Sequence, residues 1–583
     1  FAMLASYVLS RTLVPTLAMY LLKPAQEGAP PSRNPLVRAQ RAFERSFERM
    51  RAGYRELLAS LVEHRRVFIP IFLGVCLLAF LLAPHLGRNF FPDTDSGQIS
   101  LHMRAKTGTR IEETARIADL VEAAIRREIP ASELEVILDN IGLPYSTINW
   151  IHNASGVIGA SDADILISLK ESHRPTADHV RKLREVLPRE FPGVTFYFLP
   201  ADMVTQILNF GLPAPIDVQI EGNDLEGNRQ VANRLLTELR QVPGLTDLRV
   251  QQSFDSPKFE VSVDRTKAAG AGFTPRDVAN SVLLTLSGSG QTNPATFLNW
   301  QNGVSYNLVT QAPQYSVESL QDIQNIPLGG ATPSSRPQIL GDVASIERGS
   351  GMAVISHYNT RRVVDIYGSV QDRDLGAVGR DIARIVDANR RHLPRGSFMT
   401  LRGQVETMRT SYLGLLGGLA FAIVLVYLLI VVNFQSWLDP FIIISALPAA
   451  LAGIIVFLFL TDTTLSVPAL MGAIMCMGVG TANSILVVSF ARERLAAHGD
   501  ARRAALEAGF TRFRPVLMTA LAMIIGMIPM ALAMGEGGEQ NAPLGRAVIG
   551  GLICATIATL VFVPAVFSLL HGGRRPATAE VSA

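Results

Sequence analysis

Three polar side chains, whose hydroxyl and amide groups could take part in transport, lie in the interior of a hydrophobic segment. Thr481, Asn483 and Ser484 belong to the stretch GVGTANSILVVSF, inside the apolar run Val467–Phe490. An amide in hydrocarbon must find a hydrogen-bonding partner, because leaving it unpaired is costly. The same run carries small residues at every fourth position, namely Gly472, Cys476, Gly480 and Ser484. Such a stripe is typical of close helix packing, and Ala547, Gly551, Ala555 and Thr559 repeat it. Asn483 lies off the stripe, which leaves both a transport role and a packing role open.

The elements around this cluster are predicted to be membrane helices. The chain has 583 residues, of which 48% are hydrophobic and 18% charged. Runs of about 20 apolar residues are long enough to span a bilayer. We find seven: Phe1–Leu22, Phe68–Gly87, Tyr412–Phe434, Pro440–Leu460, Val467–Phe490, Pro515–Met534 and Pro543–Leu570. The fold class predicted is therefore a polytopic α-helical membrane protein with about seven transmembrane helices.

Arginine placement predicts the topology. Arginines are dense in 23–67 and 491–514 and recur in the tail 571–583, whereas the short links 461–466 and 535–541 have no Lys or Arg. Basic loops stay in the cytoplasm, so the polar block 89–404 faces outward. The net charge of +3 is explained by this bias and indicates no nucleic-acid partner.

Cysteine usage and the ends of the chain limit the chemistry further. Cys76, Cys476 and Cys554 all lie in apolar runs, so no disulfide, zinc site or cofactor is predicted. The chain opens at Phe1 inside an apolar run, without a signal-peptide pattern. We expect an earlier portion to be missing.

Charged groups are rare inside the apolar runs. No run has an interior Asp or Glu, yet proton-driven transport needs a titratable group within the membrane. Arg11 is the exception among the cations, about 13 residues before Pro24 and therefore roughly 20 Å along a helix, near the middle of the bilayer. We expect Arg11 to face an acid, or else to form a static pair or extend to an interface.

The outer block predicts two ferredoxin-like β-α-β-β-α-β units. Strand and helix patterns place the first in 89–202. The second begins in 203–288 and returns in 346–404, interrupted by a Gly-, Pro-, Asn- and Gln-rich insertion in 289–345. The remaining predicted segments are membrane helices in 1–22 and 68–87, a basic cytoplasmic linker in 23–67, five membrane helices in 412–570 and a cytoplasmic tail in 571–583.

These pieces together resemble the second half of the inner-membrane subunit of a resistance–nodulation–division (RND) efflux pump. The resemblance covers essentially the whole chain and is most specific in NFFPDTDSGQI, NFQSWLDPFIIISALPAALAG, GVGTANSILVVSF and RFRPVLMTALAMIIGMIPMAL. It implies porter subdomains and a docking subdomain in the outer block. It also implies a homotrimer in the bacterial inner membrane that exports drugs or other amphiphiles on proton-motive force, with a periplasmic adaptor, an outer-membrane channel, membrane lipid and the missing N-terminal half as partners.

The resemblance implies a proton relay, with one departure. Drug pumps of the family commonly carry a lysine just before the asparagine, in contact with acids on the fourth helix; here Ala482 stands there. The comparison places Asn483, Thr519 and Arg512 at relay positions, and we hypothesise that Arg11 replaces the lysine charge. Thr519 has the alternative of bonding its own helix, and Arg512 that of a topology residue.

A loop in the first unit is the predicted cargo contact. In the family its counterpart lines the path to the drug pocket, and here 143–161 carries Tyr145, Ile148, Trp150 and Ile151. Aromatic faces suit varied organic molecules. The alternative is an ordinary loop packed on its own domain.

Other classes fit less well. A membrane-anchored enzyme would need a catalytic motif, and HExxH, GxSxG and phosphate-loop patterns are all missing, so no enzyme activity is predicted. A receptor would want an output domain, which the short segment after Leu570 does not provide. Export of metal ions would want sulfur ligands, and Met203 is alone in its segment. Export of lipid-like molecules remains an alternative.

Overall fold

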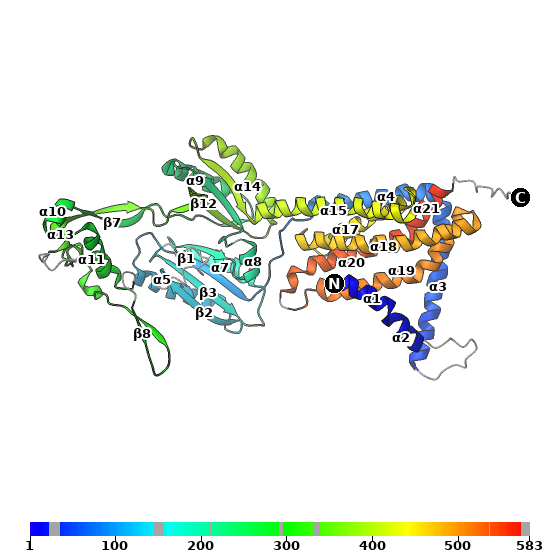
Figure 1. Cartoon of the computed structure of the whole chain (residues 1–583), viewed down its shortest axis with the longest axis horizontal. Helices are drawn as coiled ribbons and strands as arrows, with labels where there is room; N and C mark the ends of the chain where they lie inside the picture. The colour runs from blue at the N-terminus through cyan, green and yellow to red at the C-terminus, as the bar shows by residue number, and fades with distance from the viewer. Residues whose placement is uncertain are drawn as a thin grey trace.

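The protein is elongated, with an α+β block at one end and a bundle of long helices at the other (Figure 1). The structure is a computed structural model that describes residues 1–21, 35–143, 157, 159–209, 211–290, 295–329, 338–535 and 537–572. Tyr145, Ile148, Trp150 and Ile151, the predicted cargo contacts, lie outside the described residues.

The first α+β unit has two helices on a four-stranded antiparallel sheet. Its elements are β1 (Gln98–Arg104), α5 (Ile111–Glu128), β2 (Leu134–Ile141), β3 (Asp162–Leu169), α7 (Thr176–Glu190) and β4 (Thr195–Leu199). The strand order is β2-β3-β1-β4. Alternating residues such as Leu101, Met103 and Ile165 are fully buried with Ala118 and Leu183 of the helices, which is the period-2 pattern that fixes register.

The second unit repeats this topology. It consists of β5 (Ile216–Glu221), α9 (Leu225–Leu239), β6 (Leu245–Val250), β11 (Ser356–Tyr358), β12 (Arg361–Val370), α14 (Leu375–Asn389) and β13 (Phe398–Gly403), with α8 (Met203–Leu208) before it. β6, β12, β5 and β13 lie side by side in that order, with β11 also paired to β12.

The insertion is larger than the sequence predicted. Strand β7 (Ser256–Val263) pairs with β10 (Ala344–Gly351) as a separate two-stranded ribbon and not with the porter sheet. Beyond it lie α10 (Arg265–Gly270), α11 (Pro275–Ser287), β8 (Ala295–Leu298), β9 (Ser305–Leu308), α12 (Leu320–Gln324) and α13 (Leu340–Val343). The boundaries at 289 and 345 therefore need correction. Val278 of α11 shares a buried core with Phe273, Ile326 and Leu340, so α11 belongs to the insertion.

Six helices, not seven, are long and apolar enough to cross a membrane among the described residues. They span Arg65–His85, Gln404–Phe434, Leu438–Leu460, Val467–His498, Ala501–Ala531 and Ala542–His571. In element labels these are α4 (Arg65–Phe80), α15 (Gln404–Phe434), α16 (Leu438–Ile444) with α17 (Leu447–Leu460), α18 (Val467–His498), α19 (Ala501–Ala531), and α20 (Ala542–Ile557) with α21 (Val563–His571).

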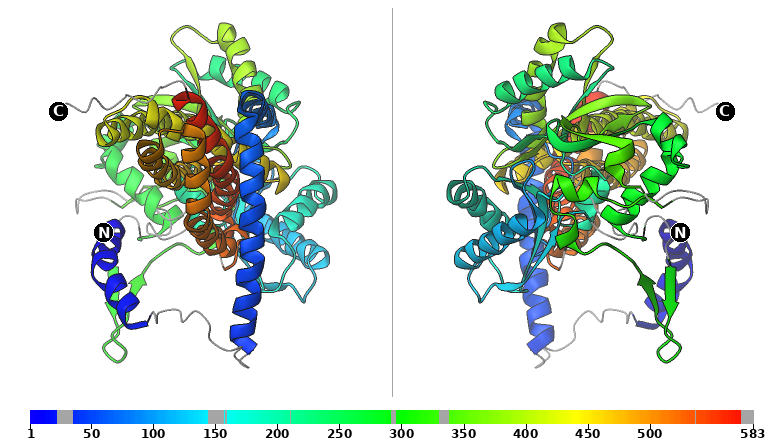
Figure 2. Two further views of the ribbon diagram at one scale, coloured as in Figure 1. Left: turned by 90° about the vertical axis from the view of Figure 1, so that its right-hand side faces the viewer. Right: turned by 90° about the vertical axis from the view of Figure 1, so that its left-hand side faces the viewer.

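The seventh predicted span forms two short helices instead. α1 (Ala2–Arg11) ends before Thr12, and α2 (Leu13–Leu21) follows. Pro15 explains the break, because its ring excludes the carbonyl of the residue four positions earlier, here Arg11, from a regular helix. Figure 2 shows α1 and α2 apart from the bundle.

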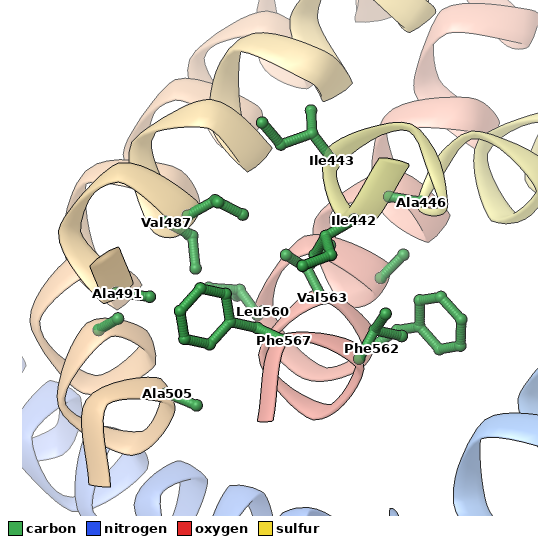
Figure 3. Close-up of a cluster of buried hydrophobic side chains, with 14 of the residues drawn as sticks. Ile442, Ile443, Ala446, Val487, Ala491, Ala505, Leu560, Phe562, Val563 and Phe567 are labelled. Carbon is green, nitrogen blue, oxygen red and sulfur yellow. The ribbon is translucent and has the colours of Figure 1, made fainter. Parts of the chain in front are cut away.

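The bundle has a buried centre and an apolar outer surface. α17, α18 and α20 pack together, whereas much of α4, α15 and α19 is exposed. Near the end farthest from the α+β block, Ile442, Val487, Phe562 and Phe567 meet in a common cluster (Figure 3). α3 (Pro35–Glu63) crosses this end (Figures 1 and 2) and buries Leu58 there.

Candidate functional site

The helix-packing stripes of α18 and the last span face each other. A Cβ built on Gly551 would lie 2.5 Å from Cys476 Sγ, and one on Gly472 would lie 2.8 Å from the Leu544 carbonyl oxygen. Further along α18, a Cβ built on Gly480 would lie 3.4 Å from the Cβ of Ala555. Only small residues permit this approach.

The stripe ends in a hydrogen bond between two buried hydroxyls. Ser484 Oγ lies 2.9 Å from Thr559 Oγ1. Thr559 is in the π-helical turn Ala558–Phe562 that separates α20 from α21. A π turn displaces backbone carbonyls from regular pairing and is frequent at functional sites; here the Leu560 carbonyl accepts a 2.7 Å bond from Tyr54 Oη of α3.

Two of the four predicted relay residues are in contact. The Thr519 hydroxyl of α19 lies 3.0 Å from Asn483 Oδ1 and 2.9 Å from the Val516 carbonyl oxygen, so it has two acceptors within reach. Asn483 is 5% exposed. The pair is neutral, so it can exchange hydrogen bonds but holds no charge of its own.

The other two predicted relay residues lie elsewhere. Arg512 is on α19, where its guanidinium carbon is 5.0 Å from the centroid of the Phe490 ring. Arg11 is exposed at the end of α1, 5.9 Å from the Tyr7 ring. The structure therefore does not bring Arg11 to Asn483, and its relay role stays a prediction. Ala482 is exposed beside Asn483.

A buried acid of the membrane helices lies at one end of the bundle. Asp439 begins α16 and is 2% exposed. Its carboxylate oxygens lie 3.3 Å from Arg492 Nη1 and 3.3 Å from His571 Nε2. This group joins the ends of three helices, and it is far along α18 from Asn483.

The α+β block contains a cleft between its two units. Its volume is about 350 Å³, and Gln404, the first residue of α15, is among its lining residues. Both units line it: Phe91, Asp93, Arg181, Arg184, Phe198 and Asp202 belong to the first, and Leu208, Val370, Asp372 and Leu375 to the second. Burial and the neighbouring Asp202 raise the pKa of Asp93 above its ordinary value.

Two arginines of α7 connect the units across this cleft. Arg181 Nη2 lies 2.7 Å from Asp372 Oδ1, and Arg184 Nε donates to Asp247 Oδ1 at 3.1 Å. Both acids have left-handed backbone, with φ of 58° at Asp372 and 53° at Asp247. Aspartate tolerates this region better than most residues, so the local chain path is adapted to present the carboxylates.

A layer of buried polar residues lies between the two sheets. In the first unit, Arg104 Nε donates to Asp162 Oδ1 at 2.8 Å, and His102 Nδ1 lies 2.6 Å from Asp164 Oδ1. The Arg104 Nη1 donates to the Gln251 carbonyl of the second unit at 3.2 Å. Burial alone would raise the pKa of Asp162, but His102 and Arg104 lower it to about 2.

In the second unit the pKa of a buried carboxylate is raised instead of lowered. Asp217 is 1% exposed, and neither carboxylate oxygen has a hydrogen-bond partner among the described residues. Burial, and then the nearby Asp365, raise its pKa to about 8, against the opposing charge of Arg402. Asp365 is instead bonded by the amides of Gln219 and Gln252 at 2.9 and 2.7 Å.

Sequence reasoning missed the cleft and the polar layer. Arg181 and Arg184 have the spacing of an ordinary solvated helix face, and their partners are far away in the sequence. The one available signal was Arg104, Asp162 and Asp164 inside otherwise apolar strands. No group of three or more His, Cys, Asp or Glu residues in the described part of the chain is placed to hold a metal ion.

Comparison with known proteins gives consistent matches. Residues 1–571 match the AcrB/AcrD/AcrF family. Protein HelA of Legionella pneumophila is 28% identical over 98% of this chain, and the cobalt-zinc-cadmium resistance protein CzcA of Cupriavidus metallidurans is 27% identical over 98%. A crystal structure of a heavy metal efflux pump matches with a TM-score of 0.75 and 26% identity over 90% of this chain.

These matches cover 53% of HelA, 52% of CzcA and 52% of the crystallised pump. The chain thus spans about half the length of the proteins it matches.

Proposed function

Because the chain belongs to the AcrB/AcrD/AcrF family, within the RND superfamily, we propose that it is the second half of an inner-membrane efflux permease. The observation that carries the proposal is the cleft between the two α+β units, which is lined from both units and by Gln404 at the start of α15. In this proposal cargo enters the cleft from the periplasm or from the outer surface of the membrane.

The cleft works by relative movement of the two units. Closing brings Arg181 and Arg184 onto Asp372 and Asp247, and opening exchanges these ion pairs for water or cargo. The Arg181–Asp372 pair is partly exposed, with side-chain exposures of 44% and 57%. Exposed pairs contribute little stability, so this contact opens at small cost, whereas the buried Arg184–Asp247 pair is the costlier one to separate.

The energy source is the proton-motive force. Asn483 and Thr519 act as neutral hydrogen-bonding members of a relay, whose acid belongs to the other half of the permease. Arg512 and Arg11 stay candidate positive members. The assembly proposed is a homotrimer joined to a periplasmic adaptor and an outer-membrane channel.

The cargo proposed is an amphiphilic organic compound. Phe91, Phe198 and Leu208 offer apolar surface, and Arg181 and Arg184 offer hydrogen bonds to polar groups. A few polar groups in an apolar lining are characteristic of small-molecule sites.

Metal ions are the second candidate cargo. The observation in favour is that CzcA is named for resistance to cobalt, zinc and cadmium, and that a matching crystal structure is titled a heavy metal efflux pump.

The proposal is tested by filling the cleft with a large side chain. The intact permease that contains this chain is expressed in an efflux-deficient host, and resistance to amphiphilic dyes and to zinc and cobalt salts is measured. Val370→Trp places a large side chain in the cleft, and Leu138→Trp on the exposed face of β2 is the matched control. Loss of dye resistance with V370W alone supports the proposal. Loss of metal resistance alone supports the second candidate, and unchanged resistance to every compound contradicts both.

A further inference from the structure

Three arginines gather where α3, α4 and α19 meet. Arg65 is the first residue of α4, Arg66 follows it, and Arg502 is in the first turn of α19. Leu58 of α3 lies against Gly509 of α19, and Arg51 Nε donates to the Phe510 carbonyl at 3.3 Å, so the two helices run antiparallel and the start of α19 lies towards the end of α3, next to Arg65. The like charges of Arg502 and Arg66 repel the Arg65 guanidinium. None of the three forms an ion pair within the described residues.

Two arginines near the cluster have acidic partners of their own. Arg503 Nε lies 3.0 Å from Glu507 Oε1, and Arg51 Nη1 lies 3.4 Å from Glu48 Oε1. Asp500 adjoins the cluster, but its carboxylate accepts from the Arg502 backbone N–H at 2.9 Å. Glu63, two residues before Arg65, is exposed. The cluster is therefore a concentration of positive charge with no ion-paired carboxylate among the described residues.

Arg65 also has an unsatisfied donor. Its Nε is buried and has no hydrogen-bond partner in the described structure, while Nη1 donates to the Val62 carbonyl at 3.3 Å. Nη2 would lie 3.6 Å from a Cβ built on Gly572, at the end of α21. A buried donor of a charged group is costly to leave unmade. An anion beside Arg65 would remove that cost and the repulsion together.

The position of the cluster identifies the anion. α4 continues from Arg65 as a membrane helix, and Val67, Ile71 and Leu78 are 62%, 59% and 64% exposed. Acyl chains fit an exposed apolar helix surface of this kind, and their headgroup phosphate would then be level with the first turn of α4. Basic pockets between membrane helices on the cytoplasmic side are suited to anionic headgroups.

We propose that Arg65, Arg66 and Arg502 bind the phosphodiester of an acidic phospholipid, whose acyl chains lie along α4. The lipid bridges the start of α4 to the start of α19 and relieves the repulsion between their charges. The arginines bind the phosphate and favour a lipid with net negative charge. Zwitterionic phospholipids bind less well, because their own ammonium group competes with the arginines for the phosphate.

The experiment uses the full permease, purified and delipidated in a neutral detergent. Phosphatidylglycerol, phosphatidylcholine or inorganic phosphate is added, and Tm and the lipid retained in native mass spectra are measured. The variant is Arg65→Gln with Arg502→Gln, and the control is Arg503→Gln, an adjacent arginine already paired with Glu507.

The expected result is a rise in Tm and retained lipid with phosphatidylglycerol only, lost in R65Q/R502Q and kept in R503Q. If R65Q/R502Q does not fold, Arg66→Gln, at an exposed position, replaces it and must weaken retention severalfold. Equal protection by phosphatidylcholine or by inorganic phosphate would overturn the lipid assignment. Equal loss in R503Q would reduce the effect to general charge and would also overturn it.

Discussion

The two ends of the molecule treat buried polar groups in opposite ways. Near the middle of α18 they are neutral and paired, as in Asn483 with Thr519 and Ser484 with Thr559, whereas the charged group of Asp439, Arg492 and His571 lies nearer one end of the bundle. Between the α+β units they are charged, and Asp217 has no hydrogen-bond partner among the described residues. In the interior of the bundle no water is at hand to solvate an unpaired charge, so the free-energy cost of burying one there is very high. The outer interface is close to a cleft that water can enter.

The comparison indicates what kind of change each region can undergo. Neutral hydroxyls and amides can exchange partners without moving charge. Buried carboxylates change their charge with pH, and their neighbours must respond. The following predictions test this contrast, starting with the largest expected change in stability.

Removing a fully paired buried acid should have the greatest effect. Asp162→Ala leaves Arg104 and His102 without their shared partner, and we expect a loss of about 3–5 kcal/mol, the usual cost of breaking a buried pair. Hydrogen exchange of the β1 and β3 amides in the intact protein measures it.

The control is an exposed pair in the same unit. Arg116 and Glu113 are bonded, but their side chains are 62% and 48% exposed. Glu113→Ala should change the protection by less than about 1 kcal/mol. Comparable losses in both variants would show that burial does not distinguish the two pairs.

The unpaired acid should give a pH dependence of opposite sign. Asp217 has a raised folded-state pKa of about 8, so the folded protein binds more protons than the unfolded chain between about pH 4 and 8, and its stability falls as pH rises through that window. Asp162, with its pKa lowered to about 2, contributes stability above pH 4 that is lost as pH falls towards 2.

Asp217→Asn should therefore stabilise β5 and β12 at pH 8 and have little effect at pH 5, as measured by hydrogen exchange at the two pH values. Asp255→Asn, at a partly exposed ion pair with Arg229, is the control and should show no such difference. A destabilised D217N at pH 8 would mean that the carboxylate is paired after all.

Within the bundle, the hydroxyl pair should matter much less. A double-mutant cycle of Ser484→Ala and Thr559→Val should give a coupling of about 0.6 kcal/mol, typical of hydrogen bonds between membrane helices. Reversible unfolding in mixed micelles measures this coupling. A value as large as that of the Asp162 contacts would remove the distinction between the two regions.

The smallest stability effect is expected for Thr519→Val, a few tenths of a kcal/mol, because the hydroxyl already divides its hydrogen bond between Asn483 and the Val516 carbonyl. Transport by the intact permease should nevertheless fall if the pair belongs to the relay. Dye efflux at matched expression is the readout, with Thr556→Val, a hydroxyl bonded within α20, as the comparison.

Sequence patterns predicted local elements better than long-range partners. The stripe through Gly472 and Ser484 was readable because four-residue spacing in an apolar run has a single structural meaning. The predicted start of the insertion at 289 was wrong because the pattern of strand β7, which lies before it, does not specify its partner, β10. Pro15 explains the break at Thr12, but the length of the apolar run favoured one continuous helix.

The site was less predictable than the fold. Arg184 and Asp247 are 63 residues apart, and nothing local to either residue identifies the other. Asp217 looks like an ordinary alternating polar residue of a strand. Its raised pKa depends first on burial and then on Asp365, which is brought close by the pairing of β5 with β12.

The direct junction of β13 with α15 has a mechanical consequence. Gly403 ends the strand with φ of 88°, Gln404 N–H donates to the Pro215 carbonyl at 2.8 Å, and the helix continues without a linker to Phe434. At 1.5 Å per residue, α15 is a rod of roughly 45 Å, and its far carbonyl accepts a bond from Arg492. A tilt of the second unit by a few degrees would therefore move the opposite end of the rod by several ångströms. Leverage of this kind would link the cleft to the far ends of the helices through rigid parts alone.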